Sequence, residues 1–167
     1  LAAISFSSIR LLHEFARQSI ANLVWSFATL GFGNAPLLDA IAAASLARIS
    51  EFNAQELANI PWSCARLEFG DAPLMQSLAA AALRTAREFG PQELPNTAWA
   101  LAKLGCVHRP LMEAISSSAI PKMSEFIAQG ISNLVWAFAR LGVEDQQLMS
   151  AISEASLRRI AEFQPQG

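Results

Sequence analysis

The feature that most constrains this chain is an internal period of 37 residues. Chance does not keep several rows of residues in phase at one step, so the chain is predicted to be an array of repeats. The rows are Trp25, Trp62, Trp99 and Trp136; Asn22, Asn59, Asn96 and Asn133; Gln18, Gln55, Gln92 and Gln129; and a Glu-Phe pair that recurs from Glu14-Phe15 to Glu162-Phe163. The predicted organisation is one unit, 1–167, with a partial copy 1–17, full copies 18–54, 55–91, 92–128 and 129–165, and a tail 166–167.

Each copy is predicted to contain two helices, A and B. Helix A of the second copy spans about Gln55 to Leu67, and Asn53 with Glu56 forms a capping box at its start. Glycine follows helix A as a C-terminal cap in three copies, whereas the second copy has Glu68 there. In the four copies helix B is expected to begin near Asn34, Asp71, His108 and Asp145, and three of these residues are favourable N-caps.

Three prolines fall inside the expected helices, and we expect each to bend or loosen its helix: Pro61, Pro95 and Pro121. One copy cannot bury its own apolar faces, but stacked copies can, since helix A of one covers helix A of the next. The predicted fold is therefore all-α, an α-solenoid of stacked helical hairpins. Both ends are expected to expose apolar surface, and Leu1 falls within a copy, so the chain is interpreted as a fragment of a longer protein.

Composition limits the possible functions. The chain is 53% hydrophobic and 16% charged, so it can bury a core, and its net charge of −2 lacks the basic excess of most phosphate-binding proteins. No apolar run is long enough to span a membrane. The two cysteines, Cys64 and Cys106, are too few for a disulfide scaffold and have no metal-binding spacing. We expect no cofactor, no metal and no small-molecule substrate.

One face of helix A carries the candidate binding residues. At 100° per residue, Gln18, Asn22, Trp25 and Thr29 form a single stripe, while Ile20, Phe27 and Leu30 face the other way. Later copies replace Thr29 with a basic residue. The candidate RNA- or partner-binding residues are Gln18, Gln55, Gln92 and Gln129; Asn22, Asn59, Asn96 and Asn133; and Arg66, Lys103 and Arg140. This prediction assumes that helix A lines the concave face.

Each row also has a structural interpretation. Amide side chains can hydrogen-bond base edges or a peptide backbone, but they also satisfy buried polar groups between helices. Indoles can stack on bases, yet tryptophan in helical repeats more often belongs to the core. We therefore assign Trp25, Trp62, Trp99 and Trp136 to the structural repeat core. The glutamates of the Glu-Phe pairs are expected to cap helices or pair with arginine.

Catalysis has no recognisable basis in the sequence. No nucleophile, metal or phosphate-loop motif is present, and the two histidines, His13 and His108, lie in distant copies. Cys64 aligns with Phe27, Leu101 and Phe138, so it is expected in the core. We expect no catalytic residues and no enzyme.

The residues resemble a known repeat family. Gln92-Glu-Leu-Pro-Asn96-Thr-Ala-Trp99-Ala-Leu-Ala-Lys-Leu-Gly105 and Gln55-Glu-Leu-Ala-Asn59-Ile-Pro-Trp62 are similar to octotricopeptide repeats and to their 37-residue relatives, the heptatricopeptide repeats. The resemblance covers all four copies. It implies an α-solenoid that binds single-stranded RNA in mitochondria or chloroplasts and supports processing, stability or translation of organelle transcripts. No targeting segment is visible in this chain.

Two functions remain open from the sequence. The first is an RNA-binding solenoid that holds about one base per repeat through the asparagine and basic rows. The second is a protein-interaction scaffold in which the same stripe binds an extended peptide or a partner helix. The charge of the concave face distinguishes them, since a continuous positive stripe favours RNA and an apolar or acidic groove favours protein.

Overall fold

The computed structural model describes residues 11–162, and that part of the chain is all-helical, as predicted. Four short 3-10 helices alternate with pairs of α-helices. In chain order the elements are η1 Leu12–Glu14, α2 Arg17–Thr29, α3 Ala35–Ala47, η2 Ile49–Glu51, α4 Ala54–Arg66, α5 Ala72–Thr85, η3 Ala86–Glu88, α6 Glu93–Lys103, α7 Arg109–Ala119, η4 Ile120–Glu125, α8 Ala128–Leu141 and α9 Gln146–Glu162. The predicted partial copy 1–17 is therefore described only from Leu11 onward.

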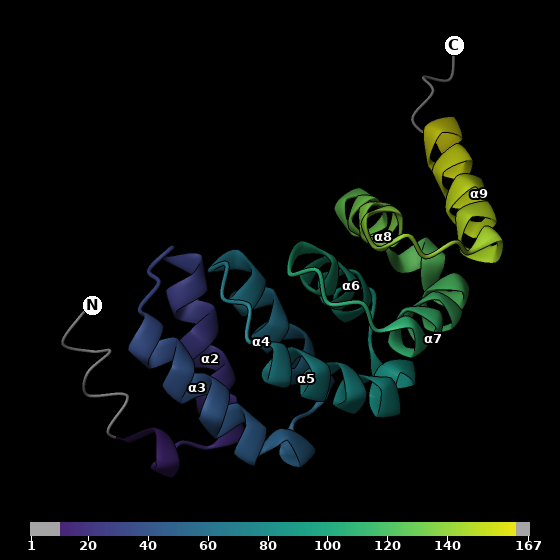
Figure 1. Ribbon diagram of the computed structural model, residues 1–167. Coiled ribbons are helices and arrows are strands. Elements are labelled where there is room, and N and C mark those ends of the chain that lie inside the picture. Colours follow the sequence, from purple (N-terminus) through teal and green to yellow (C-terminus); the bar gives the residue numbers. More distant parts are fainter. Residues whose placement is uncertain (1–10, 163–167) are drawn as a thin grey trace.

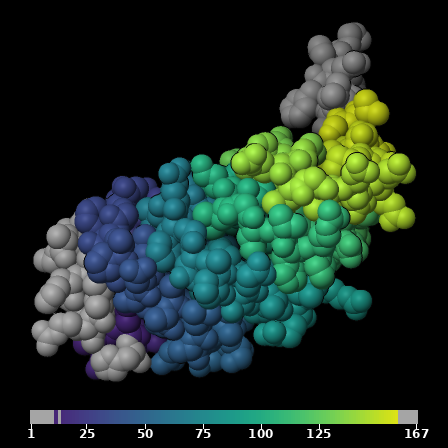
Figure 2. All heavy atoms as spheres, in the orientation of Figure 1, coloured from purple at the N-terminus to yellow at the C-terminus, as the bar shows by residue number. Residues whose placement is uncertain are grey.

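The helices form two layers. Helices α2, α4, α6 and α8 pack on one another in that order and form the inner layer, on the inner side of the bend (Figure 1). Helices α3, α5, α7 and α9 form the outer layer and contact one another less extensively. The chain advances from one end of the molecule to the other in sequence order (Figure 2). The assumption that helix A lines the concave face agrees with this arrangement.

The outer helices begin where the sequence places their caps. Asn34, Asp71, His108 and Asp145 each accept a hydrogen bond from the backbone N–H three residues later, at 2.7 to 3.2 Å. These four residues are 37 positions apart. Each side chain satisfies one of the N–H groups that the first turn of a helix leaves without a partner, which fixes the helix start.

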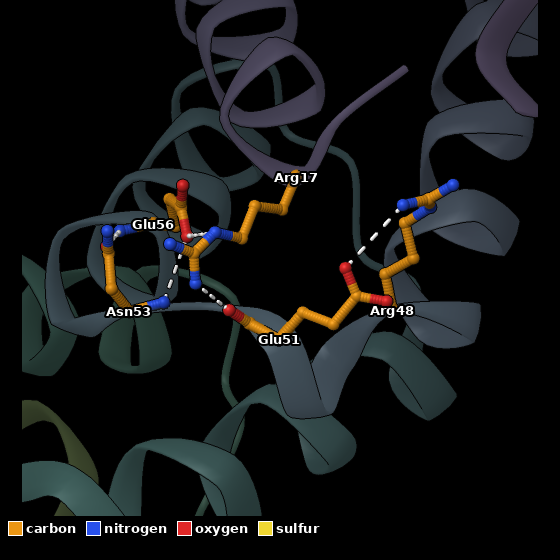
Figure 3. A network of polar contacts seen from close by, with 5 residues as sticks. All are labelled: Arg17, Arg48, Glu51, Asn53 and Glu56. Atoms are coloured by element: carbon orange, nitrogen blue, oxygen red, sulfur yellow. Dashed lines mark hydrogen bonds and ion pairs between the residues drawn. The ribbon is translucent and has the colours of Figure 1, made fainter. Parts of the chain in front are cut away.

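The capping box of α4 is confirmed, and it also joins two inner helices. Asn53 Oδ1 accepts from the Glu56 N–H, and the Glu56 carboxylate accepts from the Asn53 N–H, both at 2.9 Å. The buried Glu56 carboxylate lies 3.7 Å from Arg17 Nε at the start of α2. Arg17 also donates to the carbonyl of Glu51, and Arg48 pairs with the Glu51 carboxylate at 3.5 Å (Figure 3). One network therefore fixes the junction between α2, η2 and α4.

The Glu-Phe pairs end the 3-10 helices. Glu14, Glu51, Glu88 and Glu125 are the last residues of η1 to η4, and the phenylalanine after each has an extended backbone, with ψ between 131° and 137°. This conformation stops the helix and turns the chain toward the next inner helix. Three of the phenylalanines are buried, namely Phe52, Phe89 and Phe126. The pair Glu162-Phe163 is not covered, because Phe163 lies outside the described residues.

The prolines perturb the helices less than expected. Pro61 lies inside α4, which continues without a break to Arg66. Pro95 lies in the first turn of α6, where a missing N–H removes no helical hydrogen bond. Pro121 lies in η4, and α7 ends two residues before it at Ala119. Helices α6 and α7 are the shortest of the described α-helices, with 11 residues each, and Ile120, which precedes Pro121, keeps helical φ and ψ of −51° and −52°.

The exposed end of the inner layer carries apolar surface, as expected. Val135 on α8 is 37% exposed, whereas Val24, the equivalent residue of α2, is 0% exposed. Helix α4 packs on α2, while the described residues place no inner helix beyond α8. Among the described residues, no helix is long and apolar enough to cross a membrane.

The turn after each inner helix adopts a left-handed backbone conformation. Gly31, Gly105 and Gly142 have φ between 63° and 68°, and Glu68 takes the same conformation with φ 56°. This conformation costs an L-residue about 1–2 kcal/mol, whereas glycine adopts it freely. Glu68 also forms an exposed ion pair with Lys103 Nζ at 3.4 Å, and such pairs contribute about 0–1 kcal/mol.

Replacing Glu68 with glycine is expected to stabilise the fold by about 1 kcal/mol, because relief of backbone strain outweighs loss of the ion pair. For a chain of this size the expected rise in Tm is about 2–4 °C. Gly105→Ala is the matched control. Alanine there would adopt the strained left-handed conformation, so Tm should fall by a similar amount. No steric clash adds to this effect, because an added Cβ meets no atom within 4 Å. A fall in Tm for Glu68→Gly would show that the Lys103 contact dominates.

Candidate functional site

The predicted stripe lies on the solvent-facing side of the inner layer. Residues at i, i+4, i+7 and i+11 share one face of a helix, so each inner helix presents a glutamine, an asparagine, a tryptophan and a final polar or basic residue together. All four glutamines are exposed, Asn22 is exposed, and the other three asparagines are half-buried. The opposite face is buried at Ile20 and Phe27, but Leu30, which was predicted on that face, is 64% exposed because it lies just beyond the last residue of α2.

The tryptophans do not belong to the buried core, so that prediction is corrected. Trp25 and Trp136 are 45% and 41% exposed, and Trp62 and Trp99 are half-buried. The core consists of aliphatic residues, alanines and the phenylalanines. The large apolar indole suggested a core position. The tryptophans instead lie on the same solvent-facing side as the glutamines and asparagines, because they share their helical phase. The tryptophans are available to a ligand.

A groove crosses the inner layer and brings predicted residues from all four inner helices together. Its volume is about 550 Å³. The predicted residues that line it are Trp25, Asn59, Trp62, Gln92, Asn96, Gln129 and Asn133. The amide groups can donate and accept hydrogen bonds, and the indoles offer flat apolar surfaces.

Several predicted residues lie outside the groove. They are Gln18, Asn22, Gln55, Trp99, Trp136, Arg66, Lys103 and Arg140. Sequence reasoning missed five residues that do line it, namely Pro91, Pro95, Glu125, Ile127 and Gly130. A signal was present in the departures from the repeat pattern, because Gly130 occupies the row in which the second and third copies have Glu56 and Glu93.

Arg66, Lys103 and Arg140, here called the basic row, lie at the C-terminal ends of α4, α6 and α8. All three are exposed. The guanidinium of Arg66 lies over the Trp62 ring, 5.6 Å from its centroid, and Lys103 pairs with Glu68. Cations at helix C-termini also stabilise the helix dipole, so this row has a structural role whether or not it binds a ligand.

Both edges of the inner layer carry charges of either sign. Glu51, Glu88 and Glu125 are exposed and precede α4, α6 and α8 at the edge opposite the basic row. At that edge Arg17 pairs with Glu56 and Arg48 pairs with Glu51, and beside the basic row Glu68 pairs with Lys103. Of the residues that the structure describes, Glu125 is the one acidic residue that lines the groove, and no lysine or arginine among them does. The groove is therefore rich in uncharged amides, and it is neither a continuous positive stripe nor an apolar one.

The surroundings of Cys64, Cys106 and His108 indicate structural roles. Cys64 is 1% exposed, as predicted for a core residue, and burial followed by the charge of Asp71 raises its pKa to about 12. Burial also raises the pKa of the half-buried Cys106. A thiol must ionise to act as a nucleophile, so both shifts disfavour nucleophilic chemistry. The Nδ1 atom of His108 accepts the N–H of Leu111 at 3.2 Å as a helix cap.

Comparison with known proteins gives one family. The family model described as RESC6, RNA-editing substrate-binding complex 6 protein, matches residues 1–147. No curated protein matches the chain. The resemblance to octotricopeptide and heptatricopeptide repeats is therefore wrong as a family assignment.

The residues behind that resemblance have a physical explanation that does not depend on family. Gly105 supplies the left-handed turn after α6, and Leu94 and Leu101 fill the core beneath it. Stacked helical hairpins favour glycine and leucine at such positions, although Glu68 takes the same turn conformation after α4. This glycine and these leucines therefore indicate the helical architecture and do not identify the family.

Proposed function

The chain belongs to the RNA-editing substrate-binding complex 6 protein family, and from this we propose that it is a non-enzymatic RNA-binding component of such a complex. Single-stranded RNA would lie across the inner layer with its bases in the groove. The observation that carries the proposal is the convergence of amides and indoles from successive inner helices on one groove. Amide hydrogen bonds and aromatic stacking are the contacts by which proteins bind unpaired bases.

We further propose that the helix pairs are copies of one 37-residue unit stacked as an α-solenoid. The equal spacing of the outer-helix caps, Asn34 to Asp145, supports this organisation. So does the successive packing of α2, α4, α6 and α8. In a solenoid each repeat contributes equivalent side chains to a shared surface, which suits a linear ligand such as a nucleic-acid strand.

The phosphates are proposed to follow the basic row. Arg66, Lys103 and Arg140 lie on one edge of the inner layer, where three exposed cations recur at equivalent helix ends. We propose that the RNA backbone follows the basic edge with its bases turned toward the groove. We propose a mitochondrial location for the chain, and the expectation of a chloroplast location has no support.

A second candidate function is a protein-interaction scaffold that holds an extended peptide in the same groove. The observation in its favour is that no lysine or arginine within the described part of the chain lines the groove itself. Side-chain amides hydrogen-bond a peptide backbone as readily as a base edge. The family description names a complex, so protein contacts are also expected. We propose that these contacts lie on surfaces outside the groove.

The triple variant Arg66→Ala, Lys103→Ala, Arg140→Ala tests the RNA proposal. Each lost phosphate contact reduces the slope of log K against log salt by about 0.7 for a single strand, so the slope should fall by about 2. The measurement is fluorescence anisotropy of a labelled single-stranded RNA across a salt series. A triple variant of the outer layer, Arg84→Ala, Arg109→Ala, Arg158→Ala, removes the same charge and should leave the slope nearly unchanged.

Two results contradict the proposal. Equal slopes in the two triple variants would show that the basic row does not contact phosphate. Absence of RNA binding by the unmodified chain at low salt would favour the scaffold function.

A further inference from the structure

Glu68 occupies a position at which the other copies have glycine. The turn after each inner helix has φ between 56° and 68°, and Gly31, Gly105 and Gly142 take it at the equivalent positions. Of the residues that the structure describes, Glu68 is the one non-glycine residue with a positive φ. It also follows the C-terminal end of α4, where the helix dipole favours cations over anions. Backbone strain and the dipole both disfavour glutamate here, so local stability does not explain this residue.

The side chain of Glu68 contacts a cation of the basic row. Its Oε1 atom lies 3.4 Å from Lys103 Nζ, at the C-terminal end of the next inner helix, α6. The Glu68 and Lys103 side chains are 78% and 41% exposed, so water and salt screen the pair and it adds little to stability. The carboxylate is therefore a weak structural contact, but it lies beside the row that is proposed to hold the phosphates.

The three cations of the basic row differ in this respect. Lys103 lies 35 positions after Glu68, with which it pairs. The residues that stand 35 positions before the two arginines of the row, Arg66 and Arg140, are Gly31 and Gly105. Glycine has no side chain that could hold a cation. Within the basic row, Lys103 alone has a carboxylate at this position of the preceding copy.

We propose that Glu68 weakens the binding of single-stranded RNA by competing with phosphate for Lys103, at the centre of the basic row. A phosphate that approaches Lys103 must displace the carboxylate or lie beside it, and like charges repel at such a distance. The inference rests on the proposed function, because it assigns a negative determinant of affinity to the surface proposed to bind the RNA backbone.

Glu68→Gln tests the inference, because it removes the charge and retains the side-chain size and the left-handed backbone. RNA affinity is expected to rise about two- to five-fold at low salt, the range that an exposed ion pair provides. The measurement is fluorescence anisotropy of a labelled single-stranded RNA, with circular dichroism to establish folding. The gain should shrink as salt increases, since salt screens interactions between exposed charges.

Two controls separate the carboxylate from the backbone and from net charge. Glu68→Gly removes the carboxylate and the strain together, so it should raise RNA affinity as much as Glu68→Gln does. Glu113→Gln changes the net charge equally at an exposed position on α7, in the outer layer. It should leave RNA affinity nearly unchanged.

Lys103→Ala tests whether the effect of Glu68 passes through the cation. In the unmodified chain Lys103→Ala should weaken RNA binding less than Arg140→Ala, because Lys103 gives up an ion pair when it binds phosphate. When Glu68→Gln is also present, the two alanine variants should weaken binding about equally.

The outcomes distinguish this inference from the proposed function. Unchanged or lower affinity in Glu68→Gln, while the unmodified chain binds RNA, overturns the inference and leaves the RNA function standing. An equal gain in Glu113→Gln assigns the effect to net charge and also overturns it. Competition is excluded if Lys103→Ala has the same cost with and without Glu68→Gln. No RNA binding by the unmodified chain at low salt overturns both proposals.

Discussion

Replacing Phe126 with alanine is expected to lower the free energy of unfolding by about 3–5 kcal/mol, a large share of the roughly 5–15 kcal/mol of an ordinary domain. Phe126 is 0% exposed and lies between η4 and α8, where its extended backbone turns the chain into the inner layer. Truncation removes the ring and leaves a cavity at this junction. The fall in Tm should be about 10 °C or more by differential scanning calorimetry.

The matched control is Phe15→Ala. Phe15 holds the same place after η1 and has the same extended backbone, but its side chain is only half-buried. The expected loss is therefore clearly smaller than at Phe126, because less apolar surface returns to water. Equal losses at the two positions would mean that backbone conformation at the Glu-Phe pair, and not ring burial, determines stability.

Much of the fold could be predicted from the sequence because helix boundaries depend on local chemistry. Asn53 with Glu56 and the cap at Asp71 act within four residues, so the sequence contains all that is needed to place those helix starts. The 3-10 helices before each inner helix were not predicted. Their position depends on burial of phenylalanines such as Phe89 against neighbouring helices, which local pattern does not specify.

The candidate site was predicted in its residue types but not in its extent. Helical phase placed Asn96 and Gln92 on the exposed face, and both line the groove. The same phase predicted equal roles for Asn22 and Arg140, which lie outside it. The packing of neighbouring helices determines which members of a row line the groove. Departures from the repeat, such as Gly130, also contribute, and a pattern based on shared residues does not take them into account.

The family match and the geometry constrain function in different ways. The match covers 1–147, which includes the whole inner layer through α8, and its description names an RNA-editing substrate-binding complex. Fold alone does not imply function, so the proposal must depend on the side chains at the groove. Neither the charge pattern nor the amides by themselves separate RNA from peptide, so the family description is what favours RNA.

The triple variant Asn59→Ala, Asn96→Ala, Asn133→Ala is expected to weaken single-stranded RNA binding about 100-fold or more. Each amide that bonds a base edge with two hydrogen bonds contributes about 1–3 kcal/mol, and three such losses exceed two decades of affinity even when they are not fully additive. The measurement is fluorescence anisotropy at fixed salt, with circular dichroism and Tm to establish that the variant is folded.

Asn22 supplies the control that separates the groove from the row. It occupies the same repeat position on α2 but does not line the groove. Asn22→Ala should therefore change RNA affinity less than two-fold, while Asn96→Ala alone should weaken it about five-fold or more. Equal effects would mean that the whole row contacts RNA and the groove does not define the site. A folded triple variant with unchanged affinity would contradict the assignment of the asparagines to RNA, because groups that bind RNA through base edges cannot be removed without cost.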